Sequence, residues 1–380
     1  MPKEKLEEKQ REKQEEKPKL QEKKNRLTLF VLIGLLVVGT ALSWGWLVSL
    51  AGTFALETSS VSETVSAPVL PVQAATEPAA RFLDGLPLTD ERQPYPMGMM
   101  IENLPEVRPQ SGLSNAAVVY EALAEGGATR FLALFNGPGS HLAKIGPIRS
   151  ARPYYLEWSS EYNAAYGHAG GSPDALQMID GFGIMALNGI GREAKYFWRD
   201  RGIGAPHNLF TSSELLSRAA RDLALEEKTP SFLSWHFKDE KGVAERPSGE
   251  PYVTIKFSGY AFETEYRYRQ ATNDFARFNS GLPHEDALTG EQIRAKNVVV
   301  QIIPKILDVG EKGRLTLDVH GTGKALIFVD GGMNVGTWSK KDRTSRTEFF
   351  FEDGRPAELN RGSTWIAVVP EDKAVEYGSR

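Results

Sequence analysis

The stretch from Leu27 to Leu56 has no charged side chain, and it constrains the chain more than any other feature. Its first part, Leu27 to Leu50, is mostly apolar. As a helix rising about 1.5 Å per residue it would extend about 36 Å, enough to cross a hydrocarbon layer of about 30 Å. We therefore predict a transmembrane helix over residues 27–50.

The charges that flank this stretch predict its orientation. Lys23, Lys24 and Arg26 precede it, whereas the next basic residue after it is Arg81. Basic flanks stay in the cytoplasm, so we expect residues 1–26 to form a charged cytoplasmic tail and the folded part to be extracellular. The alternative is a cleaved signal peptide, whose apolar region is usually shorter than this one.

The composition is that of a globular protein, with 41% hydrophobic and 25% charged residues. A net charge of −4 gives no basic field for nucleic acid, so we expect no nucleic-acid partner. Cysteine is absent, which excludes disulfides, thiolate catalysis, iron–sulfur ligation and anchoring through a lipidated cysteine. Attachment to the lipid bilayer would therefore depend on the apolar helix.

Beyond the membrane segment, the pattern predicts an α+β protein in two parts. Residues 51–80 are rich in Ser, Thr, Ala and Pro and are expected to form a flexible stalk. Residues 81–238 have a mixed α/β pattern, and residues 250–372 contain short β-favouring runs typical of an antiparallel, β-rich fold. The polar stretch DEKGVAERPSGEP between them is the expected boundary.

Several local signals predict individual elements. The runs AAVVYEALA and TRFLALF are expected to be two strands joined by a tight turn at Gly126-Gly127. Ser172 followed by a proline and an acid predicts the start of a helix that runs to about Asp180. Thr211 and Glu214 have the spacing of a capping box, and HGTG and DGG are expected to be turns.

The segment IGPIRSARP offers the first candidate site. Arg149 and Arg152 are three residues apart beside a glycine–proline turn, and two guanidinium groups in such a place suit a phosphate, sulfate or carboxylate. Arg130 is a third candidate. The alternative is that these arginines pair with internal acids, for which Glu121, Glu125 and Glu157 are available.

Two further loops supply polar candidates in the same part of the chain. In GHAGGSPDAL, backbone N–H groups before a helix could hold an anion, with His168 as a general acid/base or as a ligand donor. The alternative for this histidine is a hydrogen bond at a strand end. The loop PHNLFT adds polar residues at another element end. The candidates for ligand binding are therefore Arg130, Arg149, Arg152, His168, Gly170, Gly171, Ser172, His207 and Asn208.

Several kinds of chemistry have no support in the sequence. G-x-S-x-G, Walker and Rossmann motifs are absent, and no close histidine pair with metal-ligand spacing is present. We therefore predict no cofactor and no metal.

Long segments resemble the YerB-like lipoprotein family of Gram-positive bacteria, namely MIENLPEVRPQSGLSNAAVVYEALAEGGATRFLALF, KIGPIRSARPYYLEWSSEY, HAGGSPDAL, PHNLFT and the C-terminal GTWSKKDRTSRTEFFFEDGRPAELNRGSTWIAVVP. The resemblance spans about residues 90–372. It implies a two-part domain of unknown function on the outer side of the membrane, and it offers no catalytic residues to carry over. This chain departs from the lipoprotein pattern because it has no cysteine, so the transmembrane helix would replace the lipid anchor.

The sequence leads to three hypotheses about function. The first is an envelope protein that binds an anionic or glycan ligand, such as a wall polymer, peptidoglycan or its lipid-linked precursor. The second is a hydrolase or transferase acting on the same material, with His168 as acid/base and Glu121 or Glu125 as its partner. The third is a scaffold for another membrane protein, which a large exposed apolar patch on the β-rich part would favour.

Overall fold

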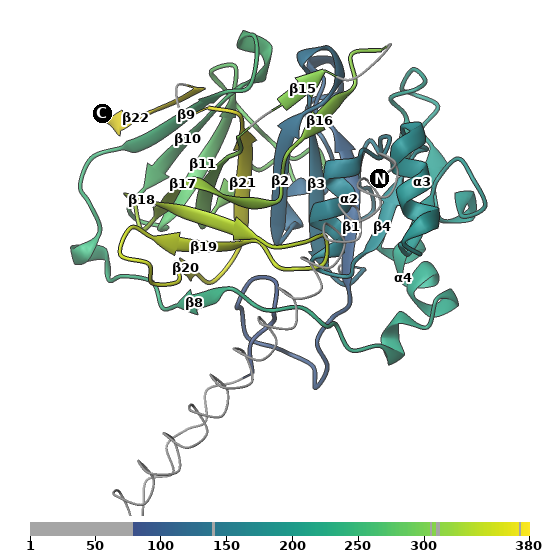
Figure 1. Ribbon diagram of the computed structural model, residues 1–380, viewed down its shortest axis with the longest axis horizontal. Coiled ribbons are helices and arrows are strands. Elements are labelled where there is room, and N and C mark those ends of the chain that lie inside the picture. The colour runs from purple at the N-terminus through teal and green to yellow at the C-terminus, as the bar shows by residue number, and fades with distance from the viewer. Residues whose placement is uncertain (1–78, 139–140, 305, 309–311, 372–373) are drawn as a thin grey trace, which may run out of the picture. The chain divides into compact units, whose positions relative to one another are not determined.

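The computed structural model describes residues 79–138, 141–304, 306–308, 312–371 and 374–380 (Figure 1). The predicted cytoplasmic tail, membrane helix and most of the stalk lie outside these residues. Within the part that the structure describes, no helix is both long and apolar enough to span a membrane. The membrane helix over 27–50 therefore stays a prediction.

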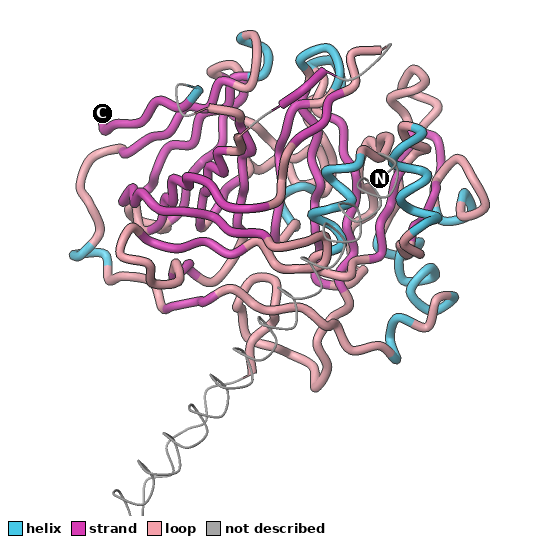
Figure 2. The backbone as a smooth tube through the Cα atoms, viewed as in Figure 1, coloured by secondary structure: helices cyan, strands magenta, loops and turns pink. Residues whose placement is uncertain are grey.

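The largest element is a ten-stranded sheet (Figure 2). Its strands, in spatial order, are β19 (Glu348–Phe351), β18 (Gly332–Lys340), β17 (Gly321–Val329), β14 (Asn297–Ile302), β21 (Thr364–Val369), β2 (Val118–Leu123), β3 (Thr129–Asn136), β1 (Pro96–Glu102), β4 (Ala165–His168) and β5 (Ala186–Asn188). The strand β21 pairs in parallel with both β14 and β2. Strands from both sides of the expected boundary at 239–251 thus share one sheet.

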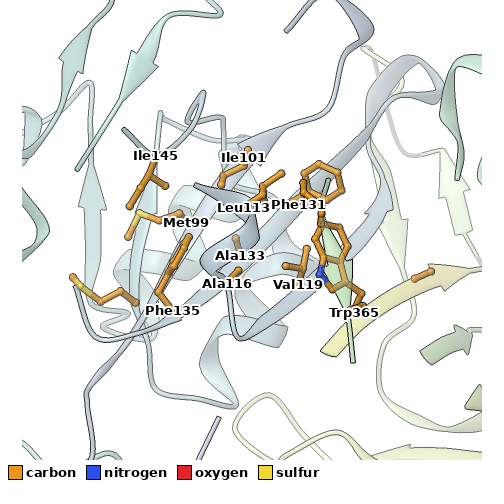
Figure 3. Packing of buried hydrophobic residues seen from close by; sticks show 14 of the residues in the cluster. Met99, Ile101, Leu113, Ala116, Val119, Phe131, Ala133, Phe135, Ile145 and Trp365 are labelled. Carbon is orange, nitrogen blue, oxygen red and sulfur yellow. The ribbon is translucent and has the colours of Figure 1, made fainter. Parts of the chain in front are cut away.

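A second sheet lies in the C-terminal half. It contains β12 (Leu282–Pro283), β11 (Asp274–Asn279), β10 (Glu263–Arg269), β9 (Pro251–Lys256) and β22 (Val375–Ser379), with β13 (Arg294–Ala295) pairing to β11. Burial alternates along β10, as expected for a strand with one face in the core. Its buried tyrosines Tyr266 and Tyr268 join the same core cluster as Phe131 and Trp365 of the large sheet. Figure 3 shows Phe131 and Trp365 with other members of that core, including Met99 and Ile101.

Helices cover the opposite face of the large sheet near β1 and β4 (Figure 1). They are α2 (Pro153–Ser160) and α3 (Pro173–Gly181), and a third helix, α4 (Ser213–Asp222), follows later in the chain. Helix α2 buries Tyr154, Tyr155 and Trp158. The hydroxyl of Tyr155 donates to the carbonyl oxygens of Ala122 and Arg130, so α2 is fixed to β2 and β3 by polar as well as apolar contacts.

Short elements complete the described chain. Three strand pairs are β6 (Trp198–Arg199) with β7 (Leu209–Phe210), β8 (His236–Lys238) with β20 (Glu358–Asn360), and β15 (Ile306–Asp308) with β16 (Leu315–Leu317). The 3-10 turns are η2 (Pro105–Val107), η3 (Leu113–Asn115), η4 (Glu125–Gly127), η5 (Ala194–Tyr196), η6 (Leu225–Glu227), η7 (Val243–Glu245) and η8 (Tyr260–Phe262).

The mixed α+β class is confirmed, with many strands and few helices. The strands β2 and β3 pair around Gly126 and Gly127, both at positive φ, and Ser172 caps α3 by accepting a hydrogen bond from the Ala175 amide, as the sequence predicted.

Two local predictions were wrong. Ser212, not Thr211, is the N-cap of α4, because the Thr211 hydroxyl is buried and donates to the carbonyl oxygen of Tyr196 instead. The HGTG segment is not a turn, since Gly321 opens the long strand β17. The turn that follows this strand lies at Asp330-Gly331, where both residues have positive φ and two residues suffice to join β17 to β18.

Candidate functional site

The segment that bears Arg149 lies between the end of β1 and the chain that follows β4. The Arg149 amide donates to the carbonyl oxygen of Met100 at 2.9 Å, and the Ala169 amide donates to the carbonyl oxygen of Arg149 at 3.0 Å. This insertion brings the IGPIRSARP segment, the end of β1 and the loop after His168 together at one place. Two of the sequence-predicted loops therefore meet at the end of β1.

Six charged or titratable side chains gather here, and we term them the basic cluster. They are Glu102, Glu125, Arg130, Arg149, Arg152 and His207. One group forms around Glu102, whose Oε1 lies 3.0 Å from Arg149 Nε and whose Oε2 lies 2.9 Å from His207 Nδ1. The Arg149 Nε contact is an ion pair without hydrogen-bond alignment, and that buried N–H has no acceptor within the described residues.

The second group in the basic cluster forms around Glu125. This carboxylate pairs with Arg152 and lies 3.0 Å from Arg130 Nη2. Burial by itself raises the pKa of Glu125, but the hydrogen bond from Arg152 and the charge of Arg130 hold that pKa below its usual value. Burial, followed by repulsion from Arg152, lowers the pKa of Arg130. The cluster therefore holds an ionised carboxylate between two guanidinium groups.

The sequence also allowed these arginines to pair with internal acids. Both Arg152 and Arg149 do so, with Glu125 and Glu102 respectively. Glu125 was among the acids considered for this role, whereas Glu102 was not. The three arginine side chains nevertheless reach solvent, with exposures of 19% for Arg149, 11% for Arg152 and 12% for Arg130. With three arginines and two carboxylates, the cluster carries an excess positive charge.

His168 lies at the end of β4 and is only 1% exposed. Its Nδ1 is 2.7 Å from the carbonyl oxygen of Gly170. Because a carbonyl oxygen can only accept, Nδ1 carries the proton and Nε2 has a free lone pair. Burial lowers the pKa of this histidine, which favours the neutral ring. The hydrogen bond at the strand end is the alternative that the sequence offered for His168.

The backbone donors before α3 are engaged by the protein itself. The Gly170 amide donates to Asn188 Oδ1 at 3.0 Å, and the Ser172 amide donates to the carbonyl oxygen of Ala151 at 3.3 Å. Gly171 packs closely on Ala151, where an added Cβ would lie 3.2 Å from the alanine Cβ. The glycine–glycine segment therefore fixes this loop to its neighbours.

Asn208 has a similar role in the loop that carries His207. Its Oδ1 accepts from Arg199 Nη1 at 2.7 Å, and its Nδ2 donates to the carbonyl oxygens of Asp200 and Ile203. These bonds tie the glycine-bearing loop together. Asn208 is therefore placed to hold His207 against Glu102.

A second ionic group, which sequence reasoning did not identify as a unit, is buried between the two sheets. We term it the sealed network, and it consists of Asn103, Gln110, Glu121, Thr129, Arg277 and His284. Arg277 Nη2 donates to Glu121 Oε2 at 2.6 Å, and both side chains are essentially unexposed. The sequence feature that could have predicted this network is Glu121 inside the apolar run of β2, because a buried carboxylate requires a partner.

Comparison with known proteins places the chain in a family. Two family profiles match, the N-terminal domain of the DUF3048 proteins of unknown function over residues 83–226 and its C-terminal domain over residues 253–366. The chain is also 31% identical over 282 residues to "Putative lipoprotein YerB" of Bacillus subtilis, covering 73% of this chain and 81% of the relative. The chain belongs to the YerB-like DUF3048 family.

A solved member of the YerB-like family has the same fold. The crystal structure of YerB from Bacillus subtilis aligns with a TM-score of 0.69 at 27% identity, over 79% of this chain and all of the other. The family assignment from sequence motifs is confirmed by the profiles, the relative and this structure.

The chemistry open to this YerB-like chain follows from its side chains. Across the described residues, no group of three or more His, Asp and Glu side chains is arranged to hold a metal ion. The carboxylates considered as partners for His168 are held by arginines, Glu121 by Arg277 and Glu125 by Arg130 and Arg152. The basic cluster is better suited to binding an anionic group than to proton transfer.

Proposed function

We propose that this chain is a membrane-anchored protein of the Gram-positive cell envelope whose folded part binds an anionic envelope polymer outside the membrane. The apolar segment 27–50 is the proposed single-pass anchor, with the N-terminus in the cytoplasm. Membership of the YerB-like family supports the placement, since the Bacillus subtilis relative carries the name of a lipoprotein. The basic cluster is the proposed binding site.

The observation that carries this proposal is the excess of guanidinium groups at a largely buried place that still reaches solvent. Arg130, Arg149 and Arg152 share two carboxylates, Glu102 and Glu125. A planar guanidinium presents parallel donors that match the oxygens of a phosphate or carboxylate. The polymer's charged group would bind at the exposed edges of these arginines.

The two carboxylates would contribute by holding the arginines in position. An arginine that is already ordered loses less side-chain entropy when it binds a ligand. Glu125 fixes both Arg130 and Arg152, and Glu102 fixes Arg149 and His207. This arrangement favours a binding role over a purely structural one, because the positive charge exceeds what the carboxylates neutralise.

The proposal is tested by sedimentation with purified Gram-positive cell walls. Full-length protein in detergent is incubated with walls, and bound protein is measured at increasing NaCl concentration. We expect sedimentation that weakens as salt rises. The Arg149→Gln/Arg152→Gln variant should bind at least about tenfold more weakly, because each charge-assisted hydrogen bond contributes about 1.5–3 kcal/mol and about 1.4 kcal/mol corresponds to tenfold in affinity.

The matched control is Arg218→Gln/Arg355→Gln, which removes the same charge from two exposed arginines. Thermal unfolding of each variant confirms that it is folded. Equal loss of binding in the two double variants would mean that only overall charge matters, and unchanged binding in Arg149→Gln/Arg152→Gln would refute the proposed site.

The same incubation distinguishes the two other hypotheses. Soluble wall fragments that disappear in a His168→Ala variant would indicate a hydrolase or transferase. Neither sedimentation nor fragments would favour a protein partner in the membrane.

A further inference from the structure

A cavity of about 580 Å³ lies between α3 and β5, next to the loop that carries His168. Its walls are formed by His168, Leu176, Ile179, Asp180, Gly183, Ile184, Ala186, Asn188, Arg192 and Glu193. None of these residues belongs to the basic cluster. The volume lies within the range of about 300–1,000 Å³ that small-molecule sites occupy.

An unpartnered polar atom of a wall residue, His168 Nε2, marks this cavity as more than a packing defect. His168 Nε2 is buried with no hydrogen-bond partner among the described residues, and so is the hydroxyl of Tyr166 beside it. The two rings lie 5.5 Å apart. A buried polar atom without a partner destabilises the fold, so a ligand that supplies the missing hydrogen bond recovers that free energy.

The chemistry of the walls indicates what the ligand would be. His168 Nε2 is an acceptor, because Nδ1 donates to Gly170, and it therefore requires a hydroxyl or N–H group. The side chains of Asp180 and Arg192 have no hydrogen bond or ion pair within the part of the chain that the structure describes. They offer a free acceptor and a free donor set at the same wall.

The charge and the apolar surface of the cavity walls restrict the class of ligand further. Asp180 and Glu193 oppose the single positive charge of Arg192, so the walls carry a net charge of −1 and disfavour an anion. Leu176, Ile179 and Ile184 supply an apolar side. Mixed donors and acceptors opposite an apolar side match a hydroxylated ring, whose hydroxyl groups bind polar atoms while its C–H face contacts aliphatic carbons.

We infer that the cavity between α3 and β5 is a sugar-binding site in which His168 Nε2 accepts a hydrogen bond from a ring hydroxyl or acetamido N–H group. The site is separate from the basic cluster and does not require its arginines. Nε2 is exposed by less than 1 Å², so binding requires a small movement of the wall. Leu176, 37% exposed, is the most exposed apolar side chain of that wall.

The inference is tested with full-length protein in detergent micelles, labelled with ¹⁵N-histidine. The chain has 6 histidines, so their ring nitrogen signals are few enough to assign by substitution. N-acetylglucosamine and glucose are titrated as probes, with cadaverine as an amine and sodium phosphate as an anion. We expect a sugar to shift the Nε2 signal of His168 and to leave exposed His236 unchanged.

Two variants separate binding at His168 from loss of the fold. His168→Asn places an amide N–H near the position of Nδ1 and keeps the bond to Gly170, but it removes the Nε2 acceptor. Ala186→Leu fills the cavity from β5 and keeps His168, whereas Ala194→Leu adds the same volume at an exposed position. We expect both cavity variants to weaken sugar binding at least tenfold by calorimetry, with Ala194→Leu unchanged.

The inference is overturned if neither sugar shifts His168, if Ala186→Leu binds sugar as the wild type does, or if cadaverine or phosphate shifts His168 while the sugars do not. Failure here is distinguishable from failure of the wall-binding proposal. Arg149→Gln/Arg152→Gln should leave the His168 response to sugar unchanged.

Discussion

The sealed network and the basic cluster both combine Glu, Arg and His side chains, and they lie on opposite faces of the part of the large sheet that β1, β2 and β3 form. Arg130 lies opposite Glu102 of β1 and Ala122 of β2, whereas Glu121 is one residue earlier on β2 and points to the other face. The sealed side is covered by the second sheet, and the open side is only partly covered by helices and loops. A shift of one residue along a strand thus determines whether a charged side chain belongs to the sealed network or to the basic cluster.

The two groups also differ in how completely their polar atoms are paired. In the sealed network, Arg277 donates to Glu121, Thr264, Tyr266 and Asn279 and also contacts His284. In the basic cluster, each arginine contacts one carboxylate and one backbone carbonyl oxygen, fewer acceptors than Arg277 has, and reaches solvent. A saturated buried group stabilises the fold and has no capacity for a ligand, whereas an unsaturated, accessible group has that capacity.

The largest effect is expected from breaking the sealed pair. Glu121→Gln leaves the Arg277 charge buried without its counter-ion, and removing one partner of such a pair costs about 3–5 kcal/mol of the free energy of unfolding. Chemical denaturation of the full-length protein measures this loss. A loss below about 1 kcal/mol would show that the network is not sealed from water.

The double variant Glu121→Leu/Arg277→Met sharpens the same comparison. Replacing both ions by apolar side chains removes the uncompensated charge, so part of the lost stability should return. Full recovery is not expected, because Asn279 and His284 lose their contacts with Arg277.

The next effect concerns pH and the two buried histidines. Burial lowers the pKa of His168, and burial together with the charges of Arg277 and Arg108 lowers that of His284. Below about pH 6.5 the unfolded chain binds protons at these positions and the folded chain does not, so stability falls as pH falls, by up to about 1.4 kcal/mol per pH unit for each histidine. Above about pH 7 both histidines are neutral in the folded and in the unfolded chain, so they add nothing to the pH dependence of the free energy of unfolding.

Unfolding measured between pH 7.5 and pH 5 tests this sign. His168→Asn should reduce the slope, and His236→Asn, at an exposed position, should leave it unchanged. Stability that increases towards pH 5 would contradict the assignment of neutral buried rings.

The smallest effect on stability is expected in the basic cluster. Glu125 is 20% exposed, and pairs that reach solvent contribute about 0–1 kcal/mol. Glu125→Gln should therefore lower the free energy of unfolding by about 1 kcal/mol or less, measured by the same denaturation. A loss as large as that of Glu121→Gln would remove the distinction between the two groups.

Local signals in the sequence were sufficient for elements whose cause lies within a few residues. Two adjacent glycines with positive φ explain the turn between β2 and β3, and Ser172 followed by proline explains the start of α3. The prediction of Thr211 as the N-cap of α4 was wrong because its hydroxyl donates to the carbonyl oxygen of Tyr196, a contact that only the folded chain creates.

The site could be predicted only in part. The loops with Arg149, His168 and His207 stand out because of their polar residues, but the partner that Arg149 and His207 share, Glu102, lies far away in sequence. His207 and Glu102 are 105 residues apart, and Arg277 and Glu121 are 156 apart. No periodicity connects such pairs, since the order of strands in the sheet brings them together. The cavity beside His168 likewise depends on how α3 packs over β5.

The most direct measurement is the response of individual arginine Nε–H signals when full-length, ¹⁵N-arginine-labelled protein in detergent is titrated with a short glycerol-phosphate oligomer. We predict that the signals of Arg149 and Arg152 shift and that the signal of Arg277, inside the sealed network, does not. Unmoved signals for Arg149 and Arg152, or equal shifts at the exposed Arg355, would contradict the account.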